Sequence, residues 1–380
     1  MTQMSKGVTH RSTSAGVGRA QAVAQLTLKE IRQSIPTECF VKSPSRSLYY
    51  LCRDSSIFLA LGGGMFMAMR SPEWATMHPA AAGALLMAYW MASGFIMWCM
   101  FVVGHDCGHG SFSSSWLLNT VCGHLMHAPL MVPYHAWAES HRRHHLYHNH
   151  YTRDYSFPWF TSEDLKAATA SVAHKIRVTF PFTGFFMYLA GIPDGGHWLP
   201  FGGRLWEHAT FRRYLRGLVS SVSVGLFLFT LGTATNWDTW FAFRLYGGCW
   251  LWFSFWLVTV TYLQHHDEET LVYTNDDWTF LRGAFQTIDR ECASCRRVAA
   301  VLLGQRVMPQ RPLRRLRCWM IRGVRWLSAR LTPGCPFTQM ATALTSSTTT
   351  SRTGTSYTTS SSPKFRTTTS PRQPKHSVSF

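Results

Sequence analysis

The chain has 380 residues, and 37 Lys and Arg against 19 Asp and Glu give a formal net charge of +18. Aromatic residues make up 14%, including 16 Trp, which excludes a wholly disordered chain. Ten Cys with a single CxxC pair exclude a disulfide scaffold and indicate reduced thiols. The charge is unevenly spread, because residues 1–290 hold 22 basic and 18 acidic residues whereas residues 291–380 hold 15 basic and one acidic. We therefore expect a nearly neutral body with a basic tail.

The N-terminal part precedes four long apolar runs. Residues 1–25 contain no acid and no apolar run of signal-peptide type, so we expect them to be disordered. The uncharged runs cover residues 56–69, 80–103, 218–235 and 245–263. The last three have the length of membrane spans, and the first is short for one. We expect four transmembrane helices in two hairpins, with residues 116–133 and 180–192 lying at the interface or re-entering the membrane.

Positive charge fixes the expected orientation of these spans. Lys and Arg are frequent before residue 56 and between residues 104 and 217, whereas the two hairpin connections carry little positive charge. The positive-inside rule places the N-terminus and the middle segment in the cytosol. The residues after the second span, before the third and after the fourth should then emerge together on the cytosolic side.

Histidines concentrate at those cytosolic ends. His105 and His109 are four residues apart at the end of the second span, and His141, His144 and His145 form an HxxHH pattern. Both spacings place imidazoles on one helix face. One such pattern is weak evidence, but two of them with a further pair at the end of the fourth span, His265 and His266, indicate a metal site. Imidazole suits Fe, Zn, Cu and Ni.

Other residues near these motifs are expected to have supporting roles. Asp106 and Glu139 are candidates for accepting hydrogen bonds from ligand imidazoles, and His266 for a similar role beside the metal. Five further histidines are expected to lie behind the ligands or at the surface: His124, His127, His135, His148 and His150.

These motifs together resemble the membrane fatty acid desaturases of the acyl-lipid Δ12/ω-3 group. The matching stretches are GHDCGHGSF (104–112), PYHAWAESHRRHH (133–145), the linker 180–207, TYLQHHDEETLVY (261–273) and WTFLRGAFQTIDRE (278–291). The resemblance implies an all-α integral membrane domain over residues 26–290, with a cytosolic histidine-rich cap holding two irons. By match, the ligands are His105, His109, His141, His144, His145 and His265.

The resemblance also implies the reaction. Such enzymes remove two hydrogens from neighbouring methylenes of a lipid-linked acyl chain, which requires metal-activated O₂ because the C–H bonds are unactivated. Their electrons come from cytochrome b5 and its reductase, or from ferredoxin in plastids. The absence of a long leader favours the endoplasmic reticulum. The choice between Δ12 and ω-3 stays open, as do two alternatives, a non-catalytic relative and a di-iron fatty acyl hydroxylase.

The family's third histidine box is missing. After His266 the sequence contains a single histidine, His376. Two irons at normal coordination need roughly eight or more protein ligands in total, so six matched imidazoles are too few. Residues 338–370 hold 21 Ser or Thr in 33 positions. If the reading frame is moved back by one nucleotide, the codons for residues 350–369 can instead encode a stretch that contains His-Val-Val-His-His. We therefore hypothesise a frame change after about Glu291, with residues 292 to about 337 as a retained intron.

The tail could instead have a role of its own. Between residues 313 and 327, Leu, Trp and Met alternate with Arg, a pattern compatible with an anionic membrane or nucleic acid. A GC-rich gene read out of frame gives a similar acid-poor tail. We expect residues 291–380 to be disordered or mistranslated, and we expect no nucleic-acid partner.

Overall fold

The computed structural model describes residues 27–154, 170–190, 196–201, 203–266 and 270–288. Within these residues the chain is helical, and its only strand-like feature is an isolated bridge between His150 and Tyr273. The N-terminal residues 1–25 and the basic tail 291–380, for which disorder is expected, lie outside the described residues. The helices are α2 (Leu28–Ser34), η1 (Thr37–Phe40), α3 (Pro44–Met69), α4 (Pro72–Thr76), α5 (Pro79–His109), α6 (Trp116–His127), η2 (Ala128–Leu130), α7 (Tyr134–Leu146), α9 (Ala170–Ala190), α10 (Gly203–Trp206), α11 (Phe211–Ala234), α12 (Thr239–Ala242), η3 (Phe243–Gly247), α13 (Gly248–His265) and α14 (Phe280–Ala284).

Helix α3 begins twelve residues before the apolar run expected at 56–69. Pro44 occupies its first turn, where the missing amide hydrogen costs nothing. The helix then continues through a charged pair, because the guanidinium of Arg53 lies 2.6 Å from the buried carboxylate of Asp54. This pairing lets an apolar helix incorporate two charges that the sequence pattern placed outside it.

Helix α5 joins the second expected span to the first histidine motif. It runs without interruption for 31 residues to His109 and is capped by Gly110, whose φ of 68° is left-handed. His105 and His109 therefore lie in the last turn of the helix, as their spacing predicts.

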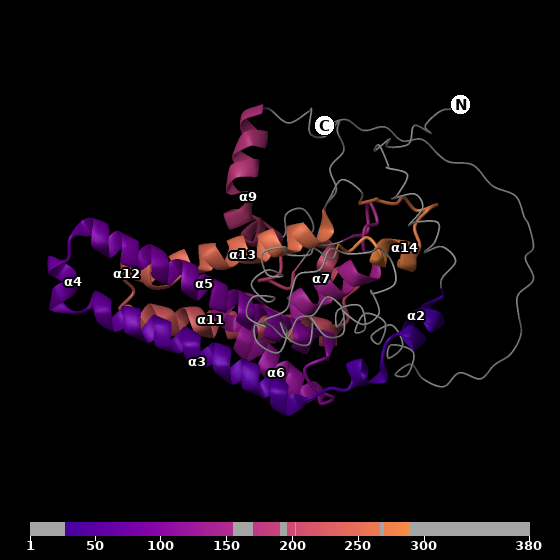
Figure 1. Ribbon diagram of the computed structural model, residues 1–380, viewed down its shortest axis with the longest axis horizontal. Helices are drawn as coiled ribbons and strands as arrows, with labels where there is room; N and C mark the ends of the chain where they lie inside the picture. The colour runs from indigo at the N-terminus through magenta and orange to yellow at the C-terminus, as the bar shows by residue number, and fades with distance from the viewer. Residues whose placement is uncertain (1–26, 155–169, 191–195, 202, 267–269, 289–380) are drawn as a thin grey trace, which may run out of the picture.

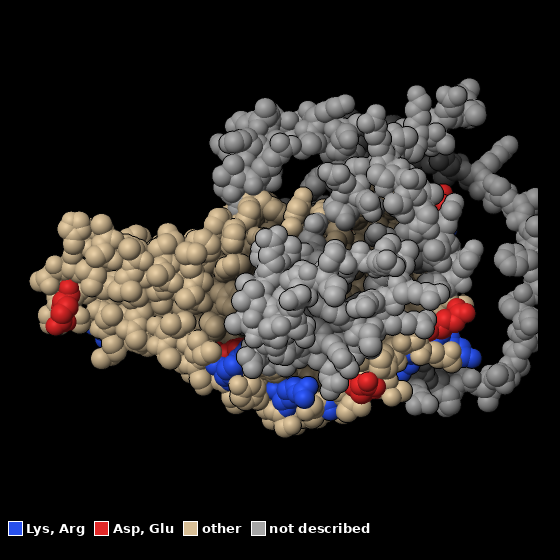
Figure 2. All heavy atoms as spheres, viewed as in Figure 1, with Lys and Arg blue, Asp and Glu red and all other residues tan. Residues whose placement is uncertain are grey.

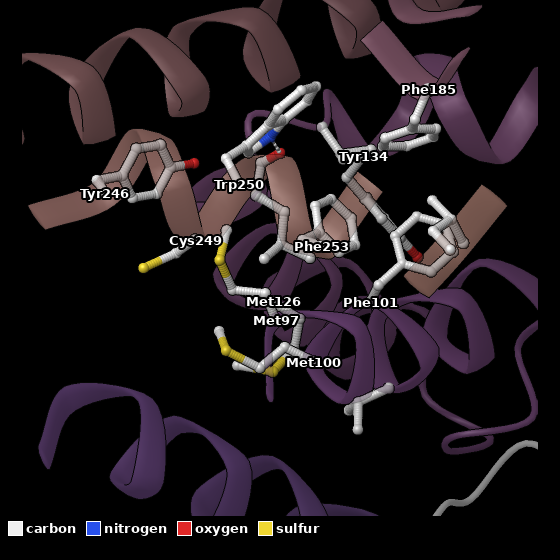
Figure 3. Close-up of a cluster of buried hydrophobic side chains, with 14 of the residues drawn as sticks. Met97, Met100, Phe101, Met126, Tyr134, Phe185, Tyr246, Cys249, Trp250 and Phe253 are labelled. Atoms are coloured by element: carbon white, nitrogen blue, oxygen red, sulfur yellow. Dashed lines mark hydrogen bonds between the residues drawn. The ribbon is translucent and has the colours of Figure 1, made fainter. Parts of the chain in front are cut away.

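Helices α3, α5, α11 and α13 lie side by side with α5 central, and α9 stands across them (Figure 1). Helix α13 packs against α5 and α9, and α5 also packs against α3 and α6. The crossing of α5 and α13 depends on Gly94, where a Cβ would lie 2.8 Å from the backbone nitrogen of Phe253. Figure 3 shows the core that surrounds this crossing, in which the indole of Trp250 donates to the carbonyl of Leu130 at 2.8 Å.

Two described helices have both the length and the apolar composition of a membrane span, α5 and α11. The other two of the four expected spans form helices at the expected places but do not meet that criterion. Helix α3 contains Arg53 and Asp54, and α13 has only 18 residues, of which several are Trp and the last two are Gln264 and His265. The prediction of four spans is thus supported for two helices.

One end of the molecule has a largely apolar surface. On the face shown in Figure 2, the part built from α3 and α5 is largely free of charged side chains up to the end near α4. Helix α11 presents an outward apolar row consisting of Leu215, Leu218, Val219, Val222, Leu226, Leu228 and Phe229. Such a row suits contact with lipid acyl chains.

The two segments expected at the interface are largely helical where they are described. Within the first, residues 116–130 form α6 and η2, and α6 exposes Trp116, Leu117, Val121 and Leu125. The segment expected at 180–192 is the second half of α9, which ends at Ala190 and contains Pro181. A short helix with one apolar face outward fits a position in the membrane interface.

Candidate metal centre

Four imidazoles from two helices converge at the end of α5. His105 and His109 come from α5, and His141 and His145 come from α7. One ring nitrogen from each of the four lies within 4.8 Å of the other three. The Nε2 atoms are 3.2 Å apart within the first pair and 3.0 Å apart within the second. We call these residues the four-histidine cluster.

The surroundings of this cluster favour neutral imidazoles. The indole of Trp137 stacks on the ring of His141, with centroids 4.6 Å apart and planes inclined by 19°. Burial, together with neighbouring imidazoles, holds the pKa of His141 and of His145 well below the ordinary value. An unprotonated imidazole has a free lone pair, so both residues are ready to bind a metal at neutral pH.

A second group of three imidazoles lies next to the first. His144 comes from α7, His265 ends α13, and His148 follows α7 by two residues. The Nε2 of His148 lies 2.7 Å from the Nδ1 of His265, and the ring centroid of His144 lies 4.9 Å from that of His148. We call these residues the three-histidine cluster.

Backbone and carboxylate acceptors orient this second group. His148 donates from Nδ1 to the carbonyl of Gly283 at 2.7 Å, which leaves its Nε2 facing the cluster. His144 Nδ1 lies 2.7 Å from the buried carboxylate of Asp154, which also accepts from the amide of Asn149. Burial alone would raise the pKa of Asp154, but electrostatic attraction to His144 and His148 and hydrogen bonds from His144 and the amide of Asn149 outweigh burial and lower that pKa. Carboxylate–histidine pairs of this kind fix the tautomer of a metal ligand.

The two clusters are adjacent along α7. The ring centroids of His144 and His145 are 5.5 Å apart, and those of His141 and His144 are 5.9 Å apart. Seven imidazoles, without a thiolate among them, match the donor set of iron or zinc. Four ligands can close one metal's coordination, whereas three leave a position open for a small molecule.

The structure brings all six predicted ligands into these clusters and adds His148. The expectation that His148 lies behind the ligands or at the surface differs from its buried position within the three-histidine cluster. The sequence contained a signal, because His141, His144, His145 and His148 continue one helical face at spacings of three, four and seven.

The three supporting residues have different outcomes. Asp106 Oδ1 lies 3.3 Å from His105 Nδ1, as expected of an acceptor. The role of Glu139 stays a prediction, and its carboxylate accepts from Arg142 at 2.9 Å and from Arg143 at 3.1 Å. Arginines three and four residues ahead on the same helix reach it first. Outside both clusters, His266 stacks on Tyr262 with centroids 4.5 Å apart.

The remaining four predicted supporting histidines are held by groups other than the clusters. His124 lies between the Thr120 carbonyl at 2.8 Å and the Ser220 hydroxyl at 3.0 Å, and the ring of His135 lies beside it. The buried rings of His127 and His150 have separate acceptors, which are the Phe101 carbonyl at 3.3 Å and the Asn275 side chain at 3.0 Å. These contacts are structural.

Comparison with known proteins gives one consistent family. The fatty acid desaturase family matches residues 54–289. A Delta(12) fatty acid desaturase, fat-2, of Caenorhabditis elegans is 37% identical over 265 residues, covering 68% of this chain and 67% of the relative. An endoplasmic reticulum omega-3 fatty acid desaturase of Nicotiana tabacum is 36% identical over 272 residues, covering 70% and 67%.

A third relative adds the electron donor to its name. The acyl-lipid omega-3 desaturase (cytochrome b5) of the endoplasmic reticulum of Arabidopsis thaliana is 34% identical over 269 residues, covering 69% of this chain and 66% of the relative. The chain thus spans about two thirds of the length of these relatives. The family match over residues 54–289 includes both histidine clusters and the helices that carry them. The chain therefore belongs to the fatty acid desaturase family, as an oxidoreductase of the acyl-lipid desaturases.

Proposed function

We propose that the chain holds two iron ions, one in each histidine cluster, and uses them with O₂ to desaturate a lipid-linked acyl chain. The adjacency of the two clusters is the observation that carries this proposal, because two sets of converging imidazoles sharing α7 suit a dinuclear centre. Proposed ligands are His105, His109, His141 and His145 for one ion, and His144, His148 and His265 for the other.

The chain's own residues prepare the site for this chemistry. Iron bound in the clusters would supply oxidation of an unactivated C–H bond, which no side-chain base achieves. Asp154 and the Gly283 carbonyl fix the rings of His144 and His148, so that the nitrogens facing the cluster are unprotonated. Trp137 packs against His141 and helps to exclude water from the four-histidine cluster.

The membrane arrangement belongs to the same proposal. We propose that α3, α5, α11 and α13 all cross the membrane in two hairpins, with the clusters at the cytosolic ends of α5 and α13. The outward apolar row of α11 supports lipid contact. The charged pair of Arg53 and Asp54 would then lie near the cytosolic interface, since α3 enters there.

The electron donor and compartment follow from the relatives' names. The Arabidopsis relative is named for cytochrome b5 and the endoplasmic reticulum. A ferredoxin appears in the name of an omega-3 desaturase from Helianthus annuus, which is chloroplastic. We propose cytochrome b5 and the endoplasmic reticulum for this chain, with a Δ12 or ω-3 double bond as the product.

The missing third box bears on the activity of this sequence. Seven clustered imidazoles fall short of the roughly eight or more ligands that two irons need at normal coordination. The region from residue 291 onward, where the frame-change hypothesis applies, lies outside the described residues. That hypothesis is tested by sequencing the spliced transcript, and a message whose open frame encodes residues 291–380 as printed would overturn it.

Expression in yeast tests the function. Iron per purified chain and the fatty acids of the host are measured for this sequence and for a frame-restored chain, in which the reading frame after about Glu291 is corrected as the hypothesis requires. A new diene or triene with about two irons per chain is the expected result for the restored form. A hydroxy acid would instead support the hydroxylase alternative. Absence of both iron and a new double bond in the restored form would support a non-catalytic relative.

A further inference from the structure

A cavity of about 440 Å³ opens beside the four-histidine cluster. Three histidines of that cluster form part of its lining. Four arginines also line it, and they are Arg142, Arg212, Arg213 and Arg216. Glu139 is the one acid among the described lining residues. The cavity therefore combines an excess of positive charge with access to the candidate metal centre.

The single carboxylate is already shared. Glu139 accepts from Arg142 at 2.9 and 3.2 Å, and Arg213 lies 3.7 Å from the same side chain. Among the described residues, no carboxylate lies within ion-pair distance of Arg212 or Arg216. In the described part of the chain, two guanidinium groups in this concave site thus have no carboxylate partner, which favours an anion there.

The backbone adds further positive charge to the cavity. The cavity lies at the N-terminus of α11, a 24-residue helix whose N-cap Thr210 makes no side-chain capping bond. The first amide groups of a helix have no partner within it, and they carry the positive end of the helix dipole. Anions, phosphates among them, bind at such ends when basic side chains accompany them.

The position of the cavity identifies the source of the anion. Arg216 lies over the ring of Trp116, with its guanidinium carbon 5.1 Å from the centroid. Trp116 belongs to the exposed apolar face of α6, and the outward apolar row of α11 begins at Leu215. Trp and Arg at the start of an apolar helix mark the headgroup level of a bilayer.

We propose that the arginine cavity binds the phosphate of the glycerolipid whose acyl chain is desaturated. The inference rests on the proposed function, because it gives that substrate its headgroup site. A protein partner would need a broad surface of about 800 Å². The observed site is instead concave, with Leu146, Trp206 and Phe280 in its lining, and such a shape encloses a small group.

Binding to the full metal-loaded chain in detergent tests the proposal. The probes are dioctanoylphosphatidylglycerol, dioctanoylglycerol, which lacks the phosphate, and inorganic phosphate. The double change Arg212→Gln with Arg216→Gln should weaken the phospholipid at least about tenfold, since charge-assisted hydrogen bonds are lost. Dioctanoylglycerol should be unaffected. Arg70→Gln is the matched control, because Arg70 packs over Phe66 at the far end of α3.

A second variant gives the opposite sign. Glu139→Gln removes the competing carboxylate and should tighten phospholipid binding, a gain that misfolding does not produce. Equal binding of the phospholipid to the double variant and the parent would overturn the proposal. Inorganic phosphate binding as tightly as the phospholipid, or an acidic electron carrier showing the arginine dependence in place of the lipid, would overturn it too. Iron content and double-bond formation are measured separately, so failure of the proposed function is recognised on its own.

Discussion

The two histidine clusters are assembled in different ways. The four-histidine cluster uses two pairs at spacing four on two helices, α5 and α7, so each half is a local feature. The three-histidine cluster gathers the end of α7, the residues just after it and the end of α13, with Gly283 behind. Local spacing therefore accounts for the first cluster, whereas the second depends on tertiary packing.

The largest expected effect comes from removing one imidazole of the three-histidine cluster. His144→Ala removes a buried imidazole of the three-histidine cluster that is held by Asp154 at 2.7 Å. We expect no detectable double bond from the frame-restored chain, measured by gas chromatography of host lipids. Persistence of the product would refute the ligand role of His144.

The next effect concerns the carboxylates behind each cluster. Asp154→Asn should weaken metal binding about 10- to 100-fold, because the orienting partner of His144 changes. Asp106→Asn should cost less, since its contact with His105 is longer at 3.3 Å. Competitive metal titration of the two variants compares them, and a larger loss for Asp106→Asn would reverse the expected order of the two carboxylates.

A smaller effect tests the close packing of α5 against α13, the helix that carries His265 of the three-histidine cluster. Gly94→Ala places a methyl group against α13 at Phe253, and overpacking of this kind costs about 1–3 kcal/mol. The thermal midpoint in detergent should fall. Gly83→Ala in the same helix is the matched control, because a Cβ there meets nothing within 4 Å and Ala favours the helix. Equal midpoints for both variants would argue against the tight crossing.

The sequence predicted the features that depend on local spacing and missed those that depend on tertiary contacts. Helical spacing placed His105 with His109 and His141 with His145, and the apolar runs located helices α3, α5, α11 and α13. The start of α3 was missed because the pairing of Arg53 with Asp54 is a contact that hydropathy ignores. Arginines on its own helix bind the carboxylate of Glu139, a pairing that the histidine spacing does not reveal. The Gly283 carbonyl that turns His148 inward is 135 residues away in sequence, beyond any local pattern.

Metal content of one pair of variants tests the central claim most directly. His148 and His150 are both buried and lie two residues apart, but His150 binds Asn275 and not the cluster. With the frame-restored chain at about two irons, His148→Ala should leave about one iron per chain and His150→Ala about two. Two irons retained in His148→Ala would contradict the three-histidine cluster as a metal site built with His148.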